Sequence, residues 1–134
     1  MTAASAAVQS LEGPRAELVL LCRDGADEHV DVWRQVAILA AAPAVEGVVY
    51  SAGMTVDLGQ PIAAGSRCTG ALVVDAPIAA VAAAPGPVSL LQVVPATATE
   101  LAWCRVRGSA ALRERWAEHA TDLLDLRRAA VSLD

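Results

Sequence analysis

The sequence predicts an α+β or α/β domain, in which a central mixed β-sheet is flanked by helices on at least one side. Two apolar runs, residues 17–22 and 88–94, have the length and composition of buried strands. The second run is followed by a Thr-x-x-Glu pattern, which is typical of a helix N-terminus. A length of 134 residues fits a single domain with its own core. Strands and helices do not alternate strictly, so a mixed sheet is expected.

The first third of the chain is predicted to contain one strand and one helix. Residues 1–14 are expected to be a flexible leader, and residues 15–134 the domain. The nearly continuous apolar run 17–22 favours a strand that is buried on both faces. Residues 29–42 are predicted to form a helix that Pro43 ends. The inner face of this helix is expected to include Val30, Trp33, Val36, Ala37 and Leu39, with Asp31, Arg34 and Gln35 outside it.

The middle of the chain is predicted to hold short strands separated by turns. Residues 48–50, 55–58 and 71–75 have the composition of strands. Residues 59–70 contain three glycines and a proline and are predicted to form a loop. Residues 76–87, rich in alanine and proline, are predicted to be a connection.

A strand-to-helix junction is predicted after the second apolar run. Pro95 is expected to stop the strand, Thr97 to be the N-cap of the following helix, and Glu100 to complete a capping box at its N3 position. The helix should end at about Arg107, with Gly108 as its C′ residue.

The C-terminal part is predicted to be a second helix followed by an irregular tail. Ser109 is expected to cap a helix over residues 110–120, with Leu112 and Trp116 facing inward. The tail, residues 122–134, offers leucines for packing. All three tryptophans, Trp33, Trp103 and Trp116, are expected in the core, because the chain contains no phenylalanine.

Charge and composition exclude several classes of function. The net charge of −5 argues against nucleic-acid binding, which relies on a basic surface. No apolar run reaches the roughly 20 residues that span a bilayer. The first residues lack the features of a signal peptide. Cys22, Cys68 and Cys104 are widely spaced and odd in number, so neither a zinc site nor a disulfide framework is predicted. A reducing cytoplasm is the expected location, and no cofactor is predicted.

No catalytic constellation is predicted. The two histidines, His29 and His119, lie near no nucleophile at a recognisable spacing. Ser66 and Arg67 lie in the glycine-rich loop 59–70, which lacks a phosphate-binding pattern. The alternative hypothesis is a ligand-binding or enzymatic domain in which Ser66, Arg67 and His119 converge on that loop.

One cluster of acidic residues is the best candidate for binding a partner. It consists of Asp24, Asp27, Glu28 and Asp31. Such a cluster steers a basic partner protein by charge complementarity. The alternative is a solvated loop leading into a helix N-terminus, where negative charge stabilises the helix dipole.

The segment 89–108 (SLLQVVPATATELAWCRVRG) resembles the corresponding segment of the Suppressor of fused-like domain family. Residues 15–20, 29–42, 53–69 and 122–132 resemble other blocks of that family in the same order. The start of the chain and Ala129, where the family usually has proline, depart from the pattern, and the chain is similar to a member shortened at its N-terminus.

The resemblance implies a protein-binding role without catalysis. Small bacterial members are similar to immunity proteins that neutralise toxins by direct binding, so such a partner is expected. A further alternative is a homodimer formed through an exposed sheet edge, because an uncovered edge can pair with another chain.

Overall fold

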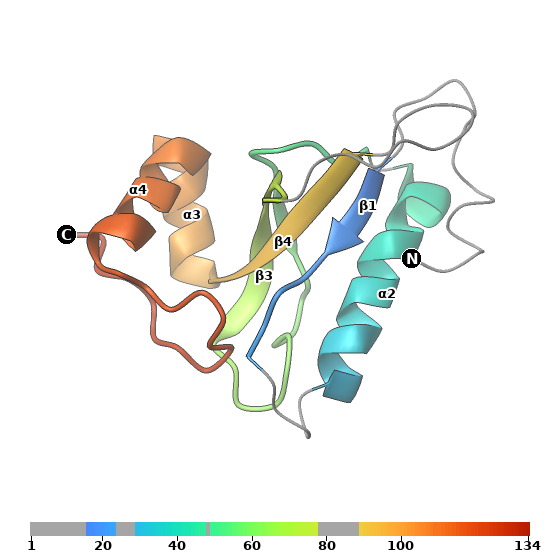
Figure 1. Ribbon diagram of the computed structural model, residues 1–134, viewed down its shortest axis with the longest axis horizontal. Coiled ribbons are helices and arrows are strands. Elements are labelled where there is room, and N and C mark those ends of the chain that lie inside the picture. Colours follow the sequence, from blue (N-terminus) through green and yellow to red (C-terminus); the bar gives the residue numbers. More distant parts are fainter. Residues whose placement is uncertain (1–15, 24–28, 48, 78–88) are drawn as a thin grey trace.

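The chain folds around a four-stranded mixed sheet with helices on both faces. The computed structural model describes residues 16–23, 29–47, 49–77 and 89–134. The strands lie in the order β1-β4-β3-β2, with β1 parallel to β4 and the other two pairs antiparallel. Figure 1 shows helix α2 on one side of the sheet and helices α3 and α4 on the other. The predicted class, a mixed sheet flanked by helices, is confirmed.

Alternation along β3 and β4 builds one core on each face. Ala71 and Val93 point toward α2 and pack with Leu39 of that helix. Their neighbours Leu72 and Val94 point the other way, into the core beneath α3 and α4. Successive side chains of a strand point to opposite faces, so these two strands separate the cores.

The first predicted strand lies at an edge of the sheet. Strand β1 spans Ala16–Val19 and, among the described strands, pairs only with β4, with Glu17 opposite Leu90. Leu21, beyond its end, is 40% exposed. The prediction of a strand buried on both faces is therefore wrong. A continuous apolar run does not by itself distinguish a central strand from an edge strand.

The described residues 49–77 contain two strands, where three were predicted in the middle of the chain. Strand β2 spans Thr55–Asp57 and β3 spans Cys68–Asp75. Val49 and Tyr50 are in no strand, which contradicts the strand predicted there. Most of the predicted connection 76–87 lies outside the described residues.

Gly70 is required where β2 and α3 both approach β3 closely. A Cβ atom at Gly70 would lie 2.4 Å from Leu101 Cδ1 and 2.5 Å from the carbonyl oxygen of Val56. The register between β3 and β4 shifts between Cys68 and Gly70. Glycine here permits a contact that no other residue would fit.

Strand β4, Ser89–Thr97, continues through Pro95 instead of stopping there. Pro95 lies opposite Ala71 of β3, and its carbonyl oxygen accepts a hydrogen bond from Arg128 on the side away from β3. β1 pairs with β4 only as far as Gln92. Because no described strand pairs with this side of Pro95, its missing N–H costs no ladder hydrogen bond.

Helix α2, His29–Glu46, likewise continues through a proline. Pro43 has no N–H to donate to the carbonyl of Leu39, one turn earlier. The hydroxyl of Tyr50 donates to that carbonyl at 2.7 Å. The prediction that Pro43 ends the helix is wrong, because a side chain from outside the helix replaces the lost hydrogen bond.

The buried face of α2 also differs from the predicted one. Val32, Gln35 and Leu39 are buried, whereas Trp33 is 70% exposed. The helix is apolar around most of its circumference, so spacing alone does not identify the inner face.

The two C-terminal helices follow the prediction closely. Helix α3 spans Ala98–Arg107 with the capping box of Thr97 and Glu100 formed, and Gly108 follows it at φ 95°. Helix α4 spans Ser109–Glu118, but Ser109 makes no side-chain cap. Leu112 and Trp116 are buried as predicted, and Trp103 is half-buried beneath Arg115.

We predict that Tyr50→Phe lowers the free energy of unfolding by roughly 1 kcal/mol, because it leaves the Leu39 carbonyl without its donor. The substitution Pro43→Ala restores a backbone N–H at that place, so Tyr50→Phe should cost less in the Pro43→Ala background. Chemical denaturation of the four proteins measures this coupling. Equal costs in both backgrounds would contradict the account of the helix continuing through Pro43.

Candidate functional site

Glu100 is the centre of a buried polar network beneath α3 and α4. Its side chain is 0% exposed. Oε1 accepts from the Thr97 amide at 2.9 Å, which is the capping-box bond. Oε2 accepts from Trp116 Nε1 at 2.9 Å and from the Val131 amide at 3.1 Å. The carboxylate therefore connects the start of α3 to α4 and to the C-terminal tail.

Arg128 supplies the counter-charge from the tail. Its Nη1 and Nη2 donate to Oε2 and Oε1 of Glu100, each at 2.9 Å, in a bidentate pair. Nη2 also donates to the Pro95 carbonyl at 3.0 Å. The guanidinium carbon lies 5.5 Å from the ring centroid of Trp116, a distance that allows a cation–π interaction.

The network holds Glu100 in its charged form. Burial raises the pKa of the Glu100 carboxyl, but the hydrogen bonds it accepts, that from Arg128 foremost, outweigh burial and lower the pKa below its ordinary value. A carboxylate whose donors are all in place is a poor proton acceptor, so this cluster is built for structure rather than for acid–base chemistry.

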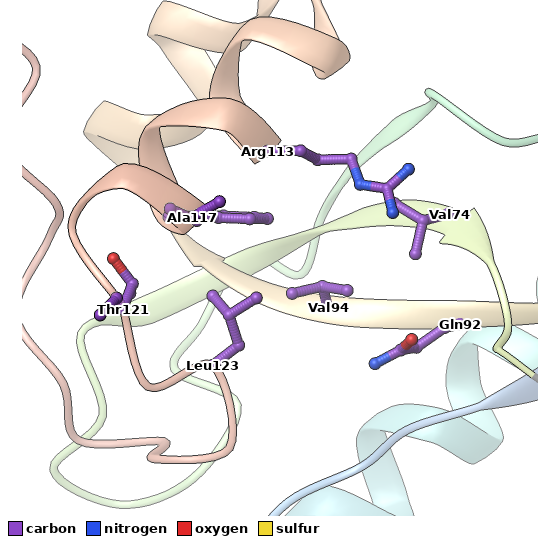
Figure 2. Close-up of a pocket in the computed structure, with 9 residues that line it drawn as sticks. Val74, Gln92, Val94, Arg113, Ala117, Thr121 and Leu123 are labelled. Carbon is purple, nitrogen blue, oxygen red and sulfur yellow. The ribbon is translucent and has the colours of Figure 1, made fainter.

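A surface groove lies directly outside this network. We call it the α4 groove; its volume is about 310 Å³. It opens between α4 and the face of strands β3 and β4 that α4 covers (Figure 2). Its lining consists of Val74, Gln92, Val94, Arg113, Trp116, Ala117, Ala120, Thr121 and Leu123. Trp116 belongs to both features, because its ring lines the groove while its Nε1 is bonded to Glu100.

Arg113 is the only charged residue among the described residues that line the α4 groove. Figure 2 shows its side chain reaching from α4 toward Val74. Arg113 is exposed and has no ion pair with any residue that the structure describes. Gln92 and Thr121, both half-buried, add an amide and a hydroxyl.

The end of α4 bears a strained residue at the rim of the groove. Thr121 donates its amide to the Trp116 carbonyl at 2.9 Å, and Ala120 donates to the Ala117 carbonyl at 3.2 Å. This is the Schellman pattern, whose C′ residue is usually glycine. Here it is Ala120, at φ 46°. The left-handed conformation costs an alanine roughly 1–2 kcal/mol.

The predicted acidic cluster is only partly described. Asp24, Asp27 and Glu28 lie outside the described residues. Asp31 lies in the first turn of α2, half-exposed, with Arg34 at 3.8 Å on the same helix. The role of this cluster in binding stays a prediction.

The residues of the alternative ligand site are not brought together at the α4 groove. Ser66 is buried, and its hydroxyl donates to the Leu126 carbonyl and accepts from the Cys68 amide. Arg67 is exposed on the same loop, and His119 is exposed at the end of α4. Ser66 thus fixes its loop against the tail.

The cysteines behave as core residues. Cys68 and Cys104 are buried, Cys22 is half-buried, and no disulfide joins any of the three to another. Burial raises the pKa of the Cys68 and Cys104 thiols, which disfavours the reactive thiolate. Among the described residues, no group of histidine, cysteine and acidic side chains is arranged to hold a metal ion.

Most residues of the groove could not be identified from the sequence. Gln92, Arg113 and Thr121 follow no recognisable pattern, and Arg128 was not identified as the partner of Glu100. The one local indication was Trp116, whose spacing from Leu112 predicted burial.

The fold and the capped strand-to-helix junction can be compared with known families. The family model described as Suppressor of fused protein (SUFU) matches residues 1–129. This chain belongs to the SUFU family. Residues 89–108, which carry the resemblance, form β4 and α3 and include Glu100.

Solved structures of SUFU proteins share the fold. A crystal structure of a SUFU homologue from Neisseria gonorrhoeae FA 1090 has a TM-score of 0.66 at 21% identity, covering 89% of this chain and 64% of that chain. Drosophila Suppressor of Fused has a TM-score of 0.66 at 14% identity, covering 76% and 25%. The Sufu–Fu complex has a TM-score of 0.64 at 12% identity, covering 75% and 45%. The chain therefore spans less than two thirds of the length of each.

No curated protein is significantly similar to this chain in sequence. In the part of the chain that the structure describes, no helix has the length and apolar character needed to cross a bilayer.

We predict that Arg128→Met lowers the free energy of unfolding by roughly 3–5 kcal/mol, because it leaves the Glu100 carboxylate buried without its counter-charge. Adding Glu100→Gln removes that charge, so the double variant should be more stable than Arg128→Met alone. Guanidinium denaturation of the single and double variants tests this. A double variant less stable than both single variants would show that the two groups do not act as a pair.

The acid stability of the protein should depend on Glu100. Its pKa is lowered in the folded state, so its contribution to stability is fully present above the ordinary value of 4.5 and is lost as the pH falls through the lower folded-state pKa. Urea denaturation at a series of pH values should therefore show a shallower loss of stability with acid for Glu100→Gln than for the wild type. Parallel curves would contradict the assignment.

Proposed function

We propose that this chain is a non-catalytic protein-binding domain, and that it acts as an immunity-type protein that neutralises a partner toxin by direct binding. The observation that carries the proposal is its membership of the SUFU family. One similar structure in that family is a complex between two proteins, Sufu and Fu. A similar bacterial protein, from Neisseria gonorrhoeae, shows that the fold also occurs in bacteria.

The use of polar groups supports a binding role. The buried carboxylate of Glu100 accepts hydrogen bonds from Thr97, Trp116, Arg128 and Val131. Ser66 is bonded in the same manner to backbone groups. These side chains are occupied in holding the scaffold, which leaves surface complementarity as the means of function.

The acidic residues of the sequence prediction are proposed to steer the partner. The chain has a net charge of −5, and a long-range field of this sign accelerates association with a basic protein. Homodimerisation is the other proposal from the sequence; β1 and β2 are the outermost strands of the described sheet and would be its contact.

The test uses the product of the gene adjacent to that of this chain, where that product is toxic on expression. Co-expression of this chain should restore growth, and the two proteins should co-purify as a stable complex. Growth that is not restored by any neighbouring product, together with a chain that purifies alone, would contradict the immunity role.

The rates of association and dissociation of the complex distinguish long-range attraction by the acidic residues from direct contact with the partner. The variant with Asp24, Asp27 and Asp31 changed to Asn and Glu28 changed to Gln should associate more slowly, by about tenfold at low salt, with a smaller change in dissociation. Light scattering of the chain alone measures the homodimer alternative, and a monomer would remove it.

A further inference from the structure

We propose that the α4 groove binds a partner segment in which an apolar side chain is followed closely by a carboxylate. This inference rests on the proposed protein-binding function and adds the contact site and its chemistry. Two features carry it: an apolar floor and, at the mouth, one arginine that has no ion pair with any described residue.

The floor of the groove is apolar and rigid. Val74, Val94 and Trp116 line it, and each is buried in the core beneath α4. Trp116 is fixed further by its hydrogen bond to Glu100. A volume of about 310 Å³ lies at the lower end of the range for binding pockets. Such a space accepts one large side chain together with adjacent backbone.

The mouth of the groove is positively charged in an otherwise acidic chain. Arg113 has no ion pair with any described residue, and its guanidinium offers a planar set of donors that matches a carboxylate in two parallel hydrogen bonds. An aspartate or glutamate beside the inserted side chain would satisfy it. A lysine or arginine there would be repelled.

The polar residues of the groove favour a peptide over a small carboxylic acid. Figure 2 shows Gln92 and Thr121 toward opposite ends, with Val94 and Leu123 between them. An amide and a hydroxyl in these positions can bond the backbone of an extended segment on either side of its apolar residue. A compact molecule that fills only the middle would reach neither end.

Ala120, at the end of α4, lies in the same groove. It holds φ 46° where glycine would be unstrained, and it lines the groove. Strained backbone is retained most often at sites of binding or catalysis.

The experiment titrates the ¹⁵N-labelled full chain with short capped peptides in which leucine, phenylalanine or tryptophan precedes two aspartates between glycine–serine flanks. At least one of them should shift the amide resonances of Val74, Gln92, Thr121 and Leu123 in a saturable manner. The same peptides with lysine in place of aspartate should bind at least about tenfold more weakly. Octanoate serves as the small carboxylic acid.

Matched variants locate the binding. Arg113→Glu should abolish the preference for aspartate, whereas Arg67→Glu, with the same change of net charge on an exposed loop, should not. Ala117→Leu fills the groove and should abolish binding; Ala102→Leu, on the exposed side of α3, should leave it unchanged. Both leucine substitutions preserve helix propensity.

Three outcomes would overturn the proposal: no shift of the groove amides at millimolar peptide, equal binding of the lysine peptides, or binding of octanoate alone. The growth assay separates it from the proposed function. If the wild type restores growth and Arg113→Glu and Ala117→Leu restore it equally, the groove is not the contact although the function stands. If the wild type fails to restore growth, the immunity role fails, and the titration still decides what the groove binds.

Discussion

The buried carboxylate of Glu100 is the constraint on which the C-terminal half of this domain depends. A charge at 0% exposure is tolerated only where every lone pair is bonded and a counter-charge is present. Meeting that condition brings the start of α3, the indole of Trp116 and the guanidinium of Arg128 to one point. The tail has no helix or strand of its own. The bonds of Arg128 to Glu100 and to the Pro95 carbonyl hold it against β4.

A buried ion pair of this kind contributes little net stability compared with apolar residues of equal volume. Its main effect is to fix the orientation of the groups that it bonds. The hydrogen bond from Trp116 to Glu100 fixes the orientation of the indole ring and the position of α4 over the sheet. Both determine the shape of the α4 groove. The polar network is buried, yet it determines the shape of the groove at the surface above it. Trp116 connects the two features, because it is bonded to Glu100 of the family segment and also lines the groove.

The sequence predicted those features whose causes are local. The capping box of Thr97 and Glu100 and the terminating Gly108 are patterns within one helical turn, and the structure confirms both. Arg128 is 28 residues from Glu100, and no spacing rule connects them. The predictions that Pro43 ends a helix and that Pro95 ends a strand were wrong for the same reason. Pro43 is accommodated by the Tyr50 side chain from outside the helix, and Pro95 by the end of the pairing with β1. The local propensity of proline contains neither piece of information.

The order of the pair along the chain has a consequence for how the domain is made. Glu100 leaves the ribosome before Arg128, and chains emerge at roughly 5–20 residues per second. During that interval the nascent chain has its sheet strands and α3 but not the cation that permits Glu100 to be buried as a charge. Until Arg128 has emerged, the core beneath α4 cannot enclose Glu100 as a paired charge, so this core is completed only when the tail is available.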